Sequence, residues 1–315
     1  MDTKITIGKI IKYYRNKIGY SQEKLADNIC DRKYIGKIEN NKQVPTIDIV
    51  DKLSAKLNVN LYDMYSLISS HHDFDTHEKI EELDSFFATG IENNLDKFLE
   101  LISDIENLES FKSGEPLQFL LYSKAMCVPY IEKNLDLAIS YTERALKVKY
   151  STCDKLFNKN NFFSHIDLIL INFMGIWLAN KAELDKSFLY FNFLYDYLIE
   201  ILSQNLYSVY RNYHFAINLL GKVTTDIFFF SGEQKTSCLG KINTVISIYK
   251  NLNYSQGVPE LLLCKTYILY KKGLFTEIPP LIKQADIIGD FFYSKEKMLG
   301  IKKEILFDLY DVIIN

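Results

Sequence analysis

The chain has 315 residues, 48% of them hydrophobic and 24% charged, which is typical of a globular protein with one large domain or two ordinary ones. No stretch reaches ~18 apolar residues without a charge, so we expect no membrane span. The five cysteines form no CxxC pair, which argues against a disulfide framework, a zinc site or another cofactor and favours a reduced, cytoplasmic protein. Residues 1–66 carry a net charge of +4 and the remainder −7, so the chain begins with a basic segment suited to meeting phosphate.

The beginning of the chain predicts two short helices. Apolar residues recur at helical spacing from Ile7 to Ile18, and Gly19 follows where a helix C-terminal cap often lies. Ser21 is then a suitable N-cap for a second helix over residues 22–29. The short connection between them predicts that the two helices pack against one another.

Three more helices complete this first domain in the prediction. A third helix spans residues 32–40, and a turn leads into a fourth over residues 46–57, with Ile47 expected to face inward. Asn60 caps a short fifth helix, with Asp63 three residues on. The sequence therefore predicts a five-helix domain over residues 1–68.

The segment that follows Ser21 resembles the helix-turn-helix of phage-repressor-like (XRE) regulators. The resemblance covers roughly residues 5–66, and the matching positions are Ser21-Gln22, Leu25-Ala26, Ile35, Ile38-Glu39, Asn40 and Pro45. One departure lies near Cys30, where the family usually has a glycine, and the turn is one residue shorter than the commonest form. The resemblance implies a domain that binds double-stranded DNA.

The docking geometry of such domains assigns roles to individual side chains. The third helix lies in the major groove, and the residues of its N-terminal part that face base edges are Arg32, Lys33, Tyr34 and Lys37. Phosphate contacts are expected from Gln22, Asn40 and Lys42. The resemblance further implies that Arg15 and Glu39 form a structural pair between the first and third helices.

Residues 69–77 are polar and aperiodic, which predicts a linker between two domains. The segment contains His71, His72 and His77. These histidines include no i,i+4 pair and have no cysteine near them, so we interpret the segment as a hydrated hinge rather than as a metal site.

From residue 78 to 315 the pattern is almost continuously helical and contains traces of a repeat. Residues 134–146 resemble the second helix of a tetratricopeptide (TPR) repeat, with Ala138 and Ala145 as its small packing residues. A weaker copy surrounds Ser187, and Gly175 lies twelve residues earlier, where the first helix of a repeat has a small residue. We therefore predict an all-α chain in which the helix-turn-helix domain is followed by a degenerate TPR-like α-solenoid that regulates and dimerises it.

This combination resembles the peptide-pheromone-responsive helix-turn-helix/TPR transcriptional regulators of Gram-positive bacteria, of the PlcR, PrgX, Rgg and NprR type, and is most similar to PlcR-like members. The shared features include the shortened turn before Cys30, the Pro45-Thr46 segment and the repeat around Ser187. The resemblance implies a homodimeric, quorum-sensing transcription factor that binds a palindromic operator. It also implies control by a short signalling peptide in the concave groove of the repeats.

Asparagine side chains are suited to holding an extended peptide, because each offers one acceptor and two donors to a backbone. Asn172 aligns with the clamp asparagine of PlcR-like proteins. A second clamp residue is expected one repeat later, where Asn212 is nearest and Asn218 is the alternative. Arg211 could meet a peptide carboxylate.

Two other functions stay open at this point. The chain could be a constitutive regulator whose repeats recruit a protein partner, or a peptide-regulated, phosphatase-like protein. The sequence has no glycine-rich phosphate loop, no HExxH and no GxSxG motif, so we predict that it is not an enzyme.

Overall fold

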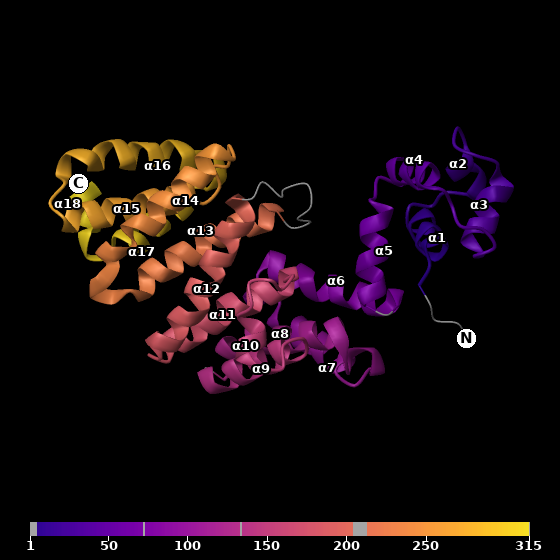
Figure 1. Cartoon of the computed structure of the whole chain (residues 1–315), viewed down its shortest axis with the longest axis horizontal. Helices are drawn as coiled ribbons and strands as arrows, with labels where there is room; N and C mark the ends of the chain where they lie inside the picture. Colours follow the sequence, from indigo (N-terminus) through magenta and orange to yellow (C-terminus); the bar gives the residue numbers. More distant parts are fainter. Residues whose placement is uncertain (1–4, 72, 133, 204–212, 315) are drawn as a thin grey trace. The chain divides into compact units, whose positions relative to one another are not determined.

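The computed structural model describes residues 5–71, 73–132, 134–203 and 213–314 (Figure 1). Every regular element in these ranges is an α-helix or a short 3-10 helix, which confirms the predicted all-α fold. The chain divides into two compact units, residues 1–133 with 147–149 and residues 134–146 with 150–315. Over the described ranges, no helix is both long and apolar enough to cross a membrane.

The first unit contains the head, by which we mean α1 to α5, followed by three α-helices and two short 3-10 helices. The bounds are α1 (Ile7–Lys17), α2 (Gln22–Ala26), α3 (Arg32–Glu39), α4 (Ile47–Leu57), α5 (Leu61–Ser70), α6 (Phe74–Thr89), η1 (Ile91–Asn93), α7 (Leu95–Ile105), η2 (Glu109–Phe111) and α8 (Gly114–Ile131).

The head encloses its own hydrophobic core, to which α1 to α5 all contribute. The predicted caps are confirmed: the Ser21 hydroxyl accepts from the Lys24 amide at 3.1 Å, and the Asn60 side chain accepts from the Tyr62 amide at 3.1 Å. Gly8 allows α1 to touch α3, because a Cβ there would lie 2.0 Å from the Ile38 carbonyl oxygen. The core therefore holds α3 rigidly against α1.

Two local predictions in the head are wrong. The second helix ends at Ala26 rather than at residue 29, because Asn28 has a left-handed backbone with φ of 60°. Ile47 does not face inward: it is the first residue of α4, next to the turn, and 73% of it is exposed. The inward face of α4 consists of Val50, Leu53 and Leu57.

The expected hydrated hinge is also wrong for His71 and His77, which are buried. Helix α5 continues to Ser70 and α6 begins at Phe74, so the turn between them is short. The two imidazoles meet with their Nδ1 atoms 3.1 Å apart. His72 lies outside the described residues, and the domain boundaries at 68 and 78 stay a prediction.

The head also packs on α6 through an aromatic contact. The Tyr13 ring stacks on Phe74 with centroids 4.6 Å apart, and the Tyr13 hydroxyl donates to a Glu78 carboxylate oxygen at 2.6 Å. These contacts hold α1 against the beginning of α6.

The second unit, which we call the helical body, contains the remaining helices. They are α9 (Leu135–Lys147), α10 (Cys153–Leu156), α11 (His165–Asn180), α12 (Leu184–Ser203), α13 (Tyr213–Phe230), η3 (Gly232–Cys238), α14 (Leu239–Asn251), α15 (Val258–Lys271), η4 (Phe275–Glu277), α16 (Ile278–Phe292), α17 (Lys295–Leu306), η5 (Phe307–Leu309) and α18 (Tyr310–Ile314).

Helices of the body stack in pairs. Helix α11 contacts α12 and α13, α13 contacts α15, and α15 contacts α16 and α17. Helices α11, α13, α15 and α17 therefore form one layer, which we call the first-helix layer.

The small residues predicted for the α11–α12 pair meet in the structure. The Ser187 hydroxyl donates to the Gly175 carbonyl at 2.7 Å, and a Cβ on Gly175 would lie 2.6 Å from the Phe191 ring. The paired helices approach closely only because residue 175 has no side chain.

Candidate functional site

A buried ion pair and one amide connect α1, α2 and α3, the helices that carry most of the residues expected to contact DNA. The Arg15 Nε and Nη2 atoms donate to the two Glu39 carboxylate oxygens at 2.6 and 2.9 Å, and Glu39 is buried. Gln22, the first residue of α2, donates from Nε2 to the same carboxylate at 2.8 Å. Bidentate, charge-assisted bonds are directional, so this network sets the orientation of α3 relative to α1 and α2.

Helix α3 presents cationic side chains to solvent. Arg32, Lys33 and Lys37 are exposed, whereas Tyr34 is half-buried against the core of the head. Arg32 also lies 3.5 Å from a Glu23 oxygen, in a contact that is largely exposed on both sides. Three of the four expected base-reading residues are therefore accessible on one short helix.

The expected phosphate contacts lie at the edges of this surface. Lys42 is exposed in the turn after α3, where its amide donates to the Lys37 carbonyl at 2.8 Å. Asn40 is exposed, and its Nδ2 donates to the Gly36 carbonyl at 2.7 Å. Gln22 is half-buried because its amide is bonded to Glu39, so its side chain supports α3 in this structure.

In the turn between α2 and α3, another residue takes the backbone conformation that a glycine usually provides. Asn28 takes the left-handed backbone, a conformation that asparagine tolerates better than most residues. Cys30 is half-buried, and its amide donates to the Ala26 carbonyl at 2.9 Å. Asp31 then caps α3 by accepting from the Lys33 amide at 2.6 Å.

In the helical body, Asn172 on α11 lies against α13. It is buried, and its Nδ2 donates to Asp226 Oδ2 at 3.3 Å, whereas its own Oδ1 is buried without a partner. Burial of the carboxylate raises the pKa of Asp226, while nearby Lys222 and Asn172 act to lower it. Lys222 Nζ lies 3.6 Å from Asp226 Oδ2.

Asn218 lies two helical turns before Asp226 on α13. It is exposed, and its Oδ1 accepts from the Tyr254 hydroxyl at 2.6 Å. Arg211 and Asn212 lie outside the described residues. Sequence reasoning missed Lys222 and Asp226, although their i,i+4 spacing from Asn218 places all three on one face of α13.

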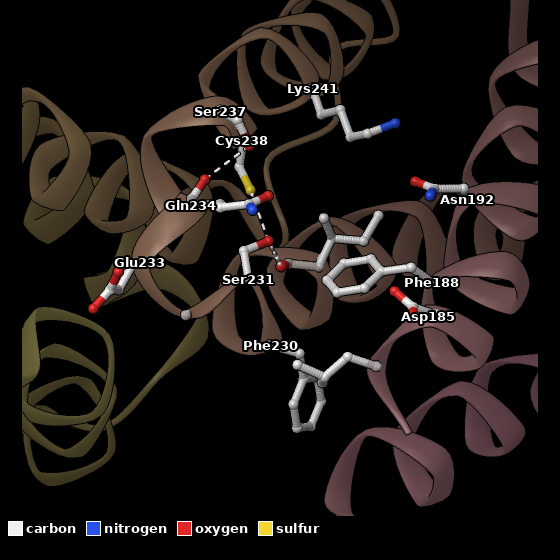
Figure 2. Close-up of a pocket in the computed structure, with 13 residues that line it drawn as sticks. Asp185, Phe188, Asn192, Phe230, Ser231, Glu233, Gln234, Ser237, Cys238 and Lys241 are labelled. Atoms are coloured by element: carbon white, nitrogen blue, oxygen red, sulfur yellow. Dashed lines mark hydrogen bonds between the residues drawn. The ribbon is translucent and has the colours of Figure 1, made fainter. Parts of the chain in front are cut away.

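A separate pocket of about 580 Å³ opens elsewhere in the body, between α12 and the segment from the end of α13 to the start of α14. Figure 2 shows the Ser231 hydroxyl between the Cys238 thiol, 3.2 Å away, and the last turn of α13. Phe188 and Phe230 provide apolar lining, and Asp185, Asn192 and Lys241 provide polar lining. None of the residues predicted from the sequence lines this pocket.

Comparison with known families bears on the head. Residues 11–64 match the family described as Helix-turn-helix (HTH_3). This segment contains α2, the turn, α3 and the Arg15–Glu39 pair described above. The head therefore contains a helix-turn-helix domain of this family.

Comparison with solved structures extends over the whole chain. PlcR of Bacillus thuringiensis, in complex with the peptide PapR7 and DNA, has a TM-score of 0.61 and 19% identity, covering 96% of this chain and 99% of that one. The apo form of the same PlcR gives a TM-score of 0.49 at 18% identity, covering 95% and 97%. The SHP pheromone receptor Rgg2 of Streptococcus dysgalactiae gives 0.47 at 16% identity, covering 95% and 98%.

The likeness to the PlcR complex shows that this chain shares the fold of that protein. Comparison with curated protein sequences gives no match.

Proposed function

We propose that this protein is a homodimeric, cytoplasmic transcription regulator whose DNA binding is controlled by a short signalling peptide held on the first-helix layer of the body. The observation that carries the peptide half is Asn172, a buried amide with an unpaired oxygen on the layer that TPR-like repeats use for extended ligands. PlcR, which has the same fold, was crystallised with a peptide and DNA.

In the DNA half of the proposal, Arg32, Lys33 and Lys37 read base edges, with Tyr34 packed beside them. Asn40 and Lys42 contact phosphates, and Gln22 does so from the start of α2 while it supports Glu39. A dimer would place two α3 helices on half-sites about one DNA turn apart, roughly 34–36 Å, so a palindromic operator is expected.

The decisive experiment is a DNA-binding titration of the full chain with and without peptide. The operator is first selected from genomic fragments, and its affinity is then measured by fluorescence anisotropy while short synthetic peptides from neighbouring small reading frames are added. We expect one peptide to change the operator affinity in the wild type and to have no effect on Asn172→Ala.

Asn243→Ala is the matched control, because Asn243 is an exposed asparagine on α14 and should leave the response intact. If no peptide changes the affinity while operator binding persists, the protein is a constitutive regulator and the peptide half is wrong. If the operator is bound no better than random DNA, the DNA half is wrong.

A further inference from the structure

The surroundings of Asn172 contain more hydrogen-bond acceptors than donors. Asp226 Oδ2 accepts a hydrogen bond from Asn172 Nδ2 at 3.3 Å and forms a longer ion pair with Lys222 Nζ at 3.6 Å. The Asn172 Oδ1 atom is buried and receives nothing. A buried acceptor without a donor is unfavourable, so this site is incomplete as it stands.

The charge at this site is also poorly balanced. The Asp226 side chain is only 13% exposed, whereas its cationic neighbour Lys222 is 54% exposed and is therefore largely hydrated. A solvated lysine at 3.6 Å compensates a buried carboxylate less well than a desolvated cation in direct contact would.

Asn218 shows what a completed site looks like on the same helix face. Its Oδ1 already accepts a hydrogen bond from the Tyr254 hydroxyl at 2.6 Å. A ligand that donates hydrogen bonds is therefore stabilised less at Asn218 than at Asn172, whose Oδ1 atom has no donor.

We infer that Asn172 and Asp226 form an anchor for an ammonium group of the bound peptide, which replaces Lys222 at the carboxylate and donates a second hydrogen bond to Asn172 Oδ1. This inference rests on the proposed peptide function and specifies the ligand: a peptide held by its free N-terminus or by a lysine side chain. A peptide anchored only by carboxylates would leave Asn172 Oδ1 without a donor and would bring a second negative charge to Asp226.

The test uses a pool of short synthetic peptides in four matched sets, with a free or acetylated N-terminus and with lysine or norleucine at one position. The full-length protein is mixed with the pool, and retained peptides are identified by size exclusion and mass spectrometry. We expect enrichment of about tenfold or more for ammonium-bearing peptides over their neutral counterparts, as a hydrogen bond to a charged group implies. The four sets show which ammonium, terminal or lysine, is used.

Asp226→Asn keeps the shape and removes the charge, so this variant should retain peptides without preferring ammonium groups. Asp196→Asn, at an exposed carboxylate on α12, should keep the wild-type preference. An unchanged preference in Asp226→Asn overturns the inference, and equal retention of acetylated, lysine-free peptides by the wild type overturns it while leaving peptide binding intact. If the wild type retains no peptide, the proposed function fails and this inference with it.

Thermal unfolding separates an anchor from a structural ion pair. Because the carboxylate is incompletely compensated without ligand, Asp226→Asn should leave Tm unchanged or raise it. A marked decrease in Tm would show that Asp226 serves the fold and would overturn the assignment.

Discussion

The buried carboxylate of Glu39 in the head and the buried amide of Asn172 in the helical body differ in how completely they are hydrogen-bonded. In the head, the Glu39 carboxylate receives three hydrogen bonds from Arg15 and Gln22, and the cationic side chains of α3 are exposed to solvent. In the body, Asn172 is equally inaccessible but keeps an unpaired oxygen beside Asp226. DNA has a nearly fixed shape, so a fully satisfied platform suits it, whereas a site that needs a ligand to complete it can respond to that ligand.

The largest effect is expected from a substitution that removes the hydrogen bonds of Arg15 and Gln22 to Glu39. Glu39→Ala removes the partner of a nearly buried Arg15, and we expect the head to lose about 3 kcal/mol of stability, as is typical when one member of a buried ion pair is removed. Hydrogen exchange of the α1–α3 amides measures this locally.

Asp48→Ala is the control for that prediction. The Asp48–Lys52 pair is exposed, with 2.9 Å between Lys52 Nζ and Asp48 Oδ2, and its loss should cost less than about 0.5 kcal/mol. Equal losses of stability in Glu39→Ala and Asp48→Ala would show that the buried Arg15–Glu39 pair stabilises the head no more than an exposed ion pair does.

The next effect tests packing in the body. Gly175→Ala places a methyl group 2.6 Å from the Phe191 ring, so we expect a loss of about 1–3 kcal/mol in the free energy of unfolding, measured with urea. Gly300→Ala, on α17, meets no atom within 4 Å and should instead gain about 0.5–1 kcal/mol through helix propensity. If both substitutions stabilise, α11 and α12 do not pack as closely as described.

The sequence predicted two helix caps in the head and one helix–helix contact in the body, because these contacts join residues that are close in sequence or follow a fixed spacing. Ser21 and Asn60 cap helices through amides two or three residues away, and Gly175 meets Ser187 twelve residues on. The helix-turn-helix was legible for the same reason, since its spacing is set by one tight turn.

The rest depends on contacts that no local pattern encodes. Asn172 and Asp226 are 54 residues apart, so only the stacking of α11 on α13 brings them together. His71 and His77 lie in a polar stretch that resembles a linker, but the contact of Tyr13 with Phe74 draws the segment into the interior. Ile47 continued the apolar period of α4, yet it is the first residue of that helix and stays in solvent.

A third prediction separates base reading from phosphate contact within the head. Lys37→Ala should reduce discrimination between the operator and random DNA by about 1–3 kcal/mol if Lys37 contacts a base edge. Lys42→Ala should weaken binding to both DNAs alike and reduce the slope of log K against log salt by about 1. Anisotropy titrations over a salt series measure both quantities.

Lys52→Ala, on the exposed face of α4, is the control and should change neither quantity much. If Lys37→Ala and Lys42→Ala weaken operator and random DNA by the same factor, then Lys37 does not read a base.

The smallest expected effect concerns pH at the junction between the head and α6. Burial lowers the pKa of His77, with Lys17 acting in the same direction and Glu81 and Glu78 opposing it. Across the Nδ1–Nδ1 contact of 3.1 Å, one imidazole must donate and the other accept, so His71 and His77 cannot both be protonated there.

A histidine whose pKa is lower in the folded state binds its proton more readily when unfolded. Its contribution to stability is therefore complete above the unfolded value of about 6.5 and is lost as pH falls through the lower folded value. We expect hydrogen exchange of the α6 amides, corrected for intrinsic rates, to accelerate as the pH falls below about 6.5. His77→Gln should flatten this dependence, because glutamine does not titrate and leaves Tyr13 stacked on Phe74. A pH dependence that persists in His77→Gln would show that another titratable group causes it and that the burial of His77 does not make the junction sensitive to pH.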